Sequence, residues 1–383
     1  MRIAVITEPY LPNISGVVVF ARQLAVGLKE AGHDVIILSA SPTRKPYVET
    51  IEGITVYRIR SIPNPWRRKF RLVVRQERTV NRILQSFNPD VIHVQDPGGS
   101  GAASLKYAKK NGIPSIGTYH FTLQFVTHYF PFSRMLSNNW KPLIRMYCNN
   151  FYNECTVITC PTETVRQDLL EQGLIPQVKV ISNGIETSSP LSIQQRTAWG
   201  DGPVKLLFVG RIDEDKNIPM LLRAFPLILA KRNVKLTIVG QGNKLAAYEK
   251  WVSKHGLDEY IHFTGALTPR GDEIVSEYAQ AHVFVMPSLI ETQSIVTMEA
   301  MVAAMPIVAA RAGALPELIK NGVNGMLVWP VTARAFADSV VRMLKDETAA
   351  NAMGQVARES VQEHSLEKTI ERFVDLYREV QKK

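Results

Sequence analysis

The chain has 383 residues, of which 45% are apolar and 21% charged, and this length and composition exclude a single small core, a disordered chain and a fibre. Its formal net charge is +10, and the whole excess lies in residues 1–185, which hold 22 Lys and Arg against 12 Asp and Glu. We therefore expect two globular domains, the first of which meets an anionic partner: nucleic acid, a polyanionic substrate or an acidic membrane face.

The hydropathy pattern gives no sign of a membrane span or a secretion signal. No apolar run reaches about 18 residues, and the first residues lack the long hydrophobic stretch and small-residue cleavage site of a signal. The three cysteines, Cys148, Cys155 and Cys160, contain no C-x-x-C pair, so neither a disulfide framework nor a four-thiolate zinc site is expected. We expect a cytosolic chain with reduced thiols.

Short apolar runs alternate with amphipathic segments along both halves of the chain. In the first half we expect strands at 3–6, 35–38, 90–94, 115–118 and 156–160, and helices at 18–28 and 100–110. In the second half we expect strands at 204–209 and 234–239, a helix at 218–230 and a closing helix at 366–380. Residues 183–203 have the composition of a linker. The alternation predicts an α/β fold of two doubly wound parallel sheets, with a ligand cleft at the carboxyl ends of the strands.

The common nucleotide motifs are absent from the sequence. The loop after the first strand supplies only Gly16, and Gly240-Gln241-Gly242 lacks the third glycine of a dinucleotide fingerprint, so we interpret it as a tight turn. No phosphate-binding G-x-x-x-x-G-K-[ST] loop occurs. Asp213-Glu214-Asp215 lies between two cations in an expected surface loop, which disfavours a metal site there.

Residues 287–319 give the strongest local signal. Glu291 and Glu299 are eight positions apart, and a helix that starts near Gln293 or Ser294 places one before it and the other inside it. The free amides of residues 294–296 then form an anion site. Carboxylates are suited to sugar hydroxyls, with which they make charge-assisted hydrogen bonds. The alternative is that both glutamates are ordinary solvated side chains.

Four segments together resemble family 4 of the retaining glycosyltransferases, which have the two-domain GT-B fold of Rossmann-like units facing a central cleft. They are the two glutamates at 291 and 299, FVGRIDEDKN at 208–217, ISNGIE at 181–186 and ISGV at 14–17. The resemblance covers almost the whole chain. It implies an acceptor-binding, membrane-facing domain at 1–185, a nucleotide-sugar-binding domain at 186–365, and a helix at 366–383 that crosses back to the first domain.

The resemblance also implies a role for individual residues. Arg211 and Lys216 match the cations on the donor diphosphate, and Gly16 matches a glycine that lets the first loop approach it. Glu291 and Glu299 match the sugar and ribose contacts. Gln293 matches a donor-binding residue, and the amides after it, those of Ser294, Ile295 and Val296, match the diphosphate cradle. Leu267 follows the strand end that binds the base, and His120 matches a histidine beside the reacting sugar. Without the resemblance, Arg211 and Lys216 are plain surface cations, Gly16 is a turn glycine and a lone histidine is usually structural.

The implied chemistry transfers a hexose with retention of its α configuration, without a metal or another cofactor and with no covalent nucleophile. Many relatives have glycine in place of Ser294 and an aromatic residue in place of Gln293. E-T-Q at 291–293 and residues 118–130 look more like the diacylglycerol glucosyltransferases, so UDP-glucose and a lipid acceptor are favoured. The alternatives are a soluble sugar or polysaccharide acceptor, a GDP-mannose-dependent mannosyltransferase, and a non-catalytic nucleotide-sugar or nucleic-acid binder.

Residues 58–82 hold nine Lys or Arg against Glu77 as the single acid. The expected membrane-binding residues are Trp66, Arg67, Arg68, Lys69, Phe70 and Arg71, and ten aromatic residues follow within 119–152. Cations attract acidic headgroups and aromatic rings settle at the interface. We expect a peripheral protein on the inner face of the cell membrane that does not bind nucleic acid. The alternative is a solvated basic helix face with an ordinary aromatic core. The sequence leaves the oligomeric state open.

Overall fold

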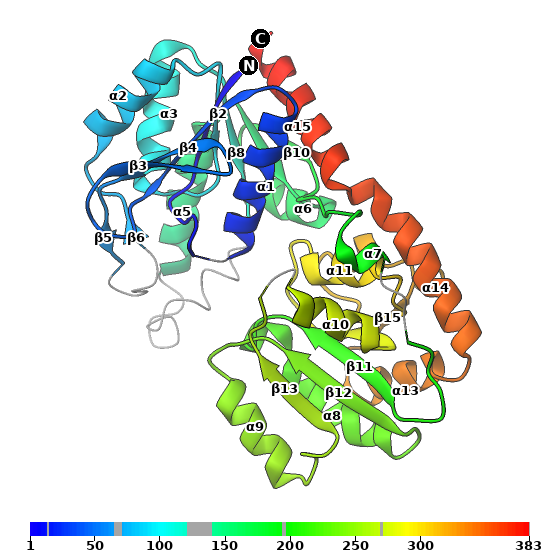
Figure 1. Ribbon diagram of the computed structural model, residues 1–383. Coiled ribbons are helices and arrows are strands. Elements are labelled where there is room, and N and C mark those ends of the chain that lie inside the picture. Colours follow the sequence, from blue (N-terminus) through cyan, green and yellow to red (C-terminus); the bar gives the residue numbers. More distant parts are fainter. Residues whose placement is uncertain (14, 65–70, 121–139, 194–196, 269–270, 383) are drawn as a thin grey trace. The chain divides into compact units, whose positions relative to one another are not determined.

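The computed structural model describes residues 1–13, 15–64, 71–120, 140–193, 197–268 and 271–382. The chain divides into two compact units (Figure 1). Each unit has buried hydrophobic clusters of its own. Unit 1 comprises Met1–Gly184 and Leu366–Lys383, and unit 2 comprises Ile185–Ser365.

Unit 1 is built on an eight-stranded sheet in the order β10-β9-β8-β7-β1-β2-β4-β3. Its strands are β1 (Arg2–Ile6), β2 (Asp34–Ala40), β3 (Tyr47–Ile51), β4 (Ile54–Ile59), β7 (Val91–Val94), β8 (Ser115–Thr118), β9 (Val157–Cys160) and β10 (Gln177–Val180). All neighbours pair in parallel except β3 with β4. A small hairpin of β5 (Ile62–Pro63) and β6 (Arg71–Leu72) lies outside this sheet. The central strands are buried throughout, as expected for a parallel sheet with helices on both faces.

The helices of unit 1 are α1 (Gly16–Glu30), α2 (Glu77–Phe87), α3 (Gly99–Asn111), α5 (Trp140–Asn153), α6 (Glu163–Glu171) and α15 (Leu366–Gln381). The Ser15 hydroxyl caps α1 by accepting from the Val18 amide at 3.4 Å. The last helix, α15, packs on α1 at Gly27, where an added Cβ would lie 2.6 Å from Ile370 Cγ1. Its apolar face, which includes Phe373 and Tyr377, belongs to the core of unit 1.

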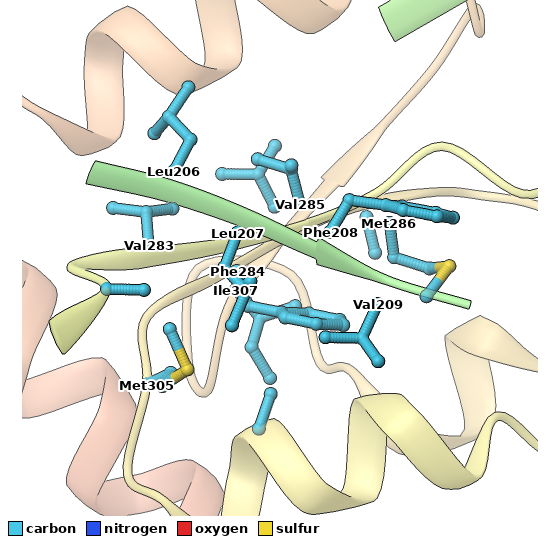
Figure 2. Packing of buried hydrophobic residues seen from close by; sticks show 14 of the residues in the cluster. Leu206, Leu207, Phe208, Val209, Val283, Phe284, Val285, Met286, Met305 and Ile307 are labelled. Carbon is cyan, nitrogen blue, oxygen red and sulfur yellow. The ribbon is translucent and has the colours of Figure 1, made fainter. Parts of the chain in front are cut away.

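Unit 2 is built on a six-stranded, wholly parallel sheet in the order β13-β12-β11-β14-β15-β16. Its strands are β11 (Val204–Val209), β12 (Val234–Val239), β13 (Ile261–Gly265), β14 (Val283–Met286), β15 (Ile307–Ala310) and β16 (Met326–Val328). Figure 2 shows side chains of β11 and β14 packed together with Met305 and Ile307. The prediction of two Rossmann-like α/β units is therefore confirmed.

The helices of unit 2 are α7 (Pro190–Ile193), α8 (Ile218–Leu229), α9 (Leu245–Lys254), α10 (Asp272–Gln280), α11 (Ile295–Val302), α12 (Leu315–Leu318), α13 (Ala333–Met343) and α14 (Glu347–Ser360). Two short 3₁₀ turns, η1 (Glu214–Lys216) and η2 (Val361–His364), complete it. None of the helices within the described ranges has the length and apolar character that crossing a bilayer requires.

The segment at 183–203 is more than the linker that its composition predicts. Leu191 and Trp199 are each 8% exposed and belong to the core of unit 2. The Trp199 amide also donates to Glu347 Oε1 at 3.1 Å. Composition misses this because a few apolar side chains among polar ones are enough to attach a segment to a core.

Each of the two large sheets has a point between two parallel strands at which the strand order reverses direction. In unit 1 this switch point lies between β1 and β7, and in unit 2 it lies between β11 and β14. Loops that leave neighbouring strands in opposite directions open a crevice at the carboxyl ends of those strands, and such crevices bind ligands. The two switch points are therefore the expected ligand sites of the two units.

Candidate functional site

The switch point of unit 2 brings three predicted residues together. Lys216 Nζ lies 2.6 Å from Glu291 Oε1, and their side chains are 11% and 8% exposed. Arg211 donates to Asp215 Oδ2 at 2.8 Å while its own side chain stays 40% exposed. Asp215 also lies 3.7 Å from Lys216 Nζ. The result is an alternating cluster of cations and carboxylates in which Arg211 is the most accessible member.

The burial of Asp215 differs from the sequence-based prediction. This residue was expected in a surface loop, but it is 8% exposed. Its carbonyl oxygen accepts from the Ser288 hydroxyl at 3.3 Å and the Leu289 amide at 3.4 Å. Asp215 therefore ties the loop after β11 to the loop after β14 and orients Arg211. No local pattern predicts this burial, because the contact between Ser288 and Asp215 spans 73 residues.

Glycines allow the loops around this cluster to pack closely. A Cβ on Gly240 would lie 1.8 Å from the Gly210 carbonyl oxygen, and one on Gly242 would lie 2.2 Å from that of Ile212. Gly313, at φ +52°, would place a Cβ 2.7 Å from the Glu291 amide nitrogen. The pair at 240 and 242 therefore supports the loop of Arg211 as well as making a turn, and Gly313 is a supporting residue that the sequence argument did not identify.

Helix α11 starts where the sequence predicts. Ser294 is its extended N-cap residue and makes no side-chain capping bond, since its hydroxyl oxygen accepts from Thr297 Oγ1 at 2.8 Å instead. The first amides of α11 are thus not capped by Ser294, and they carry the partial positive charge of a helix start. Gln293 is buried, whereas Ile295 and Val296 are half-buried against the core.

The other predicted donor residues of unit 2 lie on neighbouring elements. Glu299 is on α11, and its Oε2 accepts from the Tyr278 hydroxyl of α10 at 2.8 Å. Burial raises the pKa of Tyr278, and the negative charge of Glu299 raises it further, so this hydroxyl stays protonated and keeps donating. Leu267 follows β13 and packs half-buried on the core.

His120 lies in unit 1, two residues after β8. Its Nε2 lies 2.8 Å from Gln95 Oε1, and its ring meets the Phe20 ring edge-on with centroids 4.9 Å apart. Burial lowers the pKa of His120 to about 3, so the imidazole is neutral near pH 7. Gln95 follows β7 directly and was not singled out from the sequence, because its contact with His120 spans 25 residues.

Two buried carboxyl groups, also missed from the sequence, support the switch point of unit 1. The Glu8 amide donates to Asp96 Oδ2 at 2.9 Å, and Glu8 Oε1 accepts from the amides of Val73 and Ser100 at 3.3 Å each. Burial raises the pKa of Glu8 to about 8, with a further contribution from Asp96, and burial raises the pKa of Asp96 to about 6. These groups tie the loop after β1 to the start of α3.

Gly16 is the first residue of α1, and a Cβ added to it would meet nothing within 4 Å. The space beside it is therefore open in this structure. The expected approach of this loop to a donor phosphate stays a prediction.

The predicted membrane residues divide into three groups. Trp66, Arg67, Arg68, Lys69 and Phe70 lie outside the described residues, as do the aromatic residues at 121–132. Arg71 is half-buried and donates to Ser61 Oγ at 2.7 Å. The remaining cations of this segment are Arg58, which is 3% exposed and bonded to Glu49, and Arg60, Arg75, Arg78 and Arg82, which are exposed.

Part of the aromatic surface expected at 119–152 is core. Tyr119, Phe151 and Tyr152 are at most 7% exposed and pack in the core of unit 1. Tyr147 is the exception, at 53% exposed, and its hydroxyl donates to the Pro97 carbonyl at 2.7 Å. Tyr119, Phe151 and Tyr152 therefore fit the alternative of an ordinary aromatic core.

Comparison with known proteins shows which families this chain is similar to. The family model described as glycosyl transferases group 1 matches residues 203–346, and the model described as Glycosyltransferase Family 4 matches residues 14–189. An uncharacterized glycosyltransferase of Methanocaldococcus jannaschii is 31% identical over 90% of this chain and 90% of its own length.

Two further relatives differ in the activity that their names state. An alpha-monoglucosyldiacylglycerol synthase of Acholeplasma laidlawii is 28% identical over 85% of this chain and 84% of its own. A GDP-mannose-dependent alpha-mannosyltransferase of Corynebacterium glutamicum is 25% identical over 99% of this chain and 89% of its own. Of the solved structures, sucrose-phosphate synthase from Thermosynechococcus elongatus has a TM-score of 0.77 at 21% identity, covering 99% of this chain and 98% of that one. That likeness shows the shared fold.

Proposed function

The chain belongs to glycosyltransferase family 4, and on this premise we propose that it is a retaining, metal-independent hexosyltransferase. In this proposal glucose passes from UDP-glucose to a membrane lipid of the diacylglycerol type. Unit 2 binds the donor, and unit 1 binds the acceptor.

The cluster at the switch point of unit 2 carries the proposal. Arg211, which is 40% exposed, and Lys216 would hold the donor diphosphate, and both neutralise the negative charge that grows on it as the sugar leaves. Glu291, held by Lys216 at 2.6 Å, would accept hydrogen bonds from hydroxyls of the transferred sugar. The amides at the start of α11, which the Ser294 side chain does not cap, would complete the diphosphate site.

The remaining donor residues would act on the outer parts of the nucleotide. Glu299 would accept from the ribose hydroxyls while Tyr278 keeps it oriented. Leu267 would lie beside the base. In unit 1, His120 would contact the sugar near its reacting face, and Gly16 would let the first loop approach the phosphates.

The lipid acceptor and the glucose donor are supported by E-T-Q at 291–293 and by the similarity to the glucosyldiacylglycerol synthase. Exposed Arg60, Arg75, Arg78 and Arg82 support a peripheral position on an anionic membrane. The similarity to a GDP-mannose-dependent mannosyltransferase supports the alternative donor. The cations and carboxylates of the cluster are equally suited to either donor.

Incubation of the purified chain with total lipid extract and either labelled UDP-glucose or labelled GDP-mannose tests the proposal. We expect label in the organic phase with UDP-glucose. Label in the organic phase only with GDP-mannose would replace the donor, and label only in water-soluble product would replace the acceptor. The absence of label from every product with both donors would contradict the proposal.

A further inference from the structure

Gln95 is a buried side chain whose amide is only half used. It directly follows β7 at the switch point of unit 1, is 0% exposed, and its backbone N–H donates to the Ile6 carbonyl at 2.9 Å. Its Oε1 contacts His120 Nε2 at 2.8 Å. Within the part of the chain that the structure describes, its Nε2 has no hydrogen-bond partner.

A purely structural role does not explain this amide. A buried polar group without a partner loses its hydration and regains nothing, so an apolar side chain of the same size would suit the core better. Unsatisfied buried groups in native folds are few, and one reason to retain them is function. The partner of the other half of the amide is His120, which points to a role exerted through that imidazole.

The orientation of the Gln95 amide, with Oε1 toward His120, assigns the imidazole hydrogen to one nitrogen. The imidazole is neutral because burial lowers the pKa of His120 to about 3, and a neutral imidazole has one N–H. Since Gln95 Oε1 can only accept, the hydrogen lies on Nε2 and the lone pair on Nδ1. The edge-on contact with Phe20, at an interplanar angle of 62°, restricts the ring plane.

The titratable groups near His120 do not change the assignment of its hydrogen to Nε2. His93 of β7 has Nδ1 at 2.8 Å from the Tyr377 hydroxyl and Nε2 at 2.6 Å from Thr118 Oγ1, and burial lowers its pKa to about 3. Burial raises the pKa of Tyr377, so its hydroxyl is protonated. Asp96 follows Gln95 in the chain, and the Glu8 amide donates to it. Both histidines are thus neutral above about pH 5.

We propose that Gln95 is a positioning residue that holds His120 as the neutral Nε2–H tautomer, so that Nδ1 accepts a hydrogen bond from a hydroxyl of the bound ligand. The identity of that ligand, a sugar or lipid alcohol, rests on the proposed function. The tautomer does not, because it follows from the contacts of unit 1 alone. The opposite orientation of the Gln95 amide would place its NH₂ against His120 and the imidazole hydrogen on Nδ1.

Two-bond ¹H–¹⁵N correlation spectra of the native chain with labelled histidine test the tautomer directly. We expect the His120 ring to show a protonated Nε2 and an unprotonated Nδ1 from pH 5 to pH 8. A protonated Nδ1, or a mixture of both tautomers, would overturn the proposal. The spectrum needs neither ligand nor turnover, so its outcome is independent of whether glucose transfer is found.

Two variants of Gln95 test the consequence for turnover. Gln95→Met keeps the length but loses the acceptor, and we expect kcat to fall at least tenfold with little change in Tm. Gln95→Glu places a carboxylate against Nε2–H, which favours the imidazolium and raises the pKa of His120. The kcat of Gln95→Glu should fall at acidic pH, because a protonated Nδ1 can no longer accept a hydrogen bond from the ligand hydroxyl.

Gln177→Glu is the matched control, since it makes the same chemical change at an exposed position of β10, an edge strand of the same sheet. Gln95 variants with the kcat and the pH profile of this control would overturn the positioning role. If the Gln95 variants do not fold, the spectrum of the native chain still decides the tautomer.

Discussion

Glu291 and Lys216 are the residues on which the proposed donor site depends most. We expect Glu291→Gln to lower kcat by roughly ten- to a hundredfold, because a hydrogen bond to a charged group contributes about 1.5–3 kcal/mol. The substitution keeps the shape of the side chain beside Lys216 Nζ, which lies 2.6 Å from Glu291 Oε1. Steady-state kinetics of hexose transfer measure the effect.

Glu299→Gln is the control for this change, since Glu299 is bonded to Tyr278 and would contact the ribose, far from the reacting carbon. Loss of an interaction that is equally strong in the ground and transition states raises KM and leaves kcat nearly unchanged. If Glu299→Gln lowered kcat while Glu291→Gln did not, the two assigned roles would be exchanged.

Glu8 gives unit 1 a pH-dependent stability. The pKa of its carboxyl is about 8, raised by burial and by Asp96 from the ordinary value of 4.5. A carboxyl with a raised pKa favours the folded state fully below pH 4.5, and this contribution is lost as pH rises to 8. Between pH 4.5 and pH 8 we expect the free energy of unfolding to fall less for Glu8→Gln than for the native chain. The amide oxygen of the variant can still accept from the amides of Val73 and Ser100.

Urea unfolding at several pH values measures this difference. Glu154→Gln serves as the control, because Glu154 is in an exposed pair with Lys109. A stability difference between Glu8→Gln and the native chain that stays constant from pH 4.5 to pH 8 would rule out titration of Glu8 in this range.

Helix α15 is the element that completes the core of unit 1. Phe373 is 0% exposed and meets the rings of Phe20 and His93 at 5.8 and 5.3 Å between centroids. We expect Phe373→Ala to destabilise unit 1 by about 3–5 kcal/mol, the usual cost of a phenylalanine-sized cavity. Denaturant unfolding followed by a probe in unit 1 measures the loss.

Arg378→Ala is the control on the same helix. Arg378 is exposed and pairs with Asp375 across one turn, so its removal should change stability by less than about 0.5 kcal/mol. Equal effects of the two substitutions would show that α15 does not belong to the core of unit 1.

Much of the fold could be predicted from the sequence because many of its strands are short, mostly apolar runs. β8 at Ser115–Thr118 and β11 at Val204–Val209 have the predicted bounds. Features that depend on distant segments could not be predicted. The order of the strands fixes the two switch points, and it also brings Gln95 to His120 and Asp215 to the loop after β14.

In the candidate site, too, local features could be predicted from the sequence, whereas the burial of individual side chains could not. The helix start after Gln293 is a local feature, and it was predicted correctly. The burial of Tyr119, Phe151 and Tyr152 was not, because an aromatic residue suits both a core and an interface. Arg58 shows that charge alone is equally ambiguous, since it is buried against Glu49 and lies over the Tyr10 ring.

At the scale of the whole chain, the surplus of positive charge in residues 1–185 should govern membrane binding. We expect the chain to sediment with vesicles that contain acidic lipid, and we expect this binding to weaken as the salt concentration rises. Replacement of Arg75, Arg78 and Arg82 with serine should weaken vesicle binding further, since each cation near an anionic surface contributes about 1 kcal/mol. Serine at exposed Arg223, Arg232 and Lys235 of unit 2 is the control with equal charge. Equal binding to neutral and acidic vesicles would contradict the electrostatic account.

In our proposal, the cluster at the switch point of unit 2 directs glucose from UDP-glucose onto a lipid with retention of configuration. The most direct measurement is the proton NMR spectrum of the glycolipid formed by the purified chain from UDP-glucose and diacylglycerol in anionic vesicles. We predict an α-linked glucosyl lipid that forms at a strongly reduced rate with Glu291→Gln. A β-linked product, or no glycolipid from a folded chain that transfers sugar to a water-soluble acceptor, would contradict the claim.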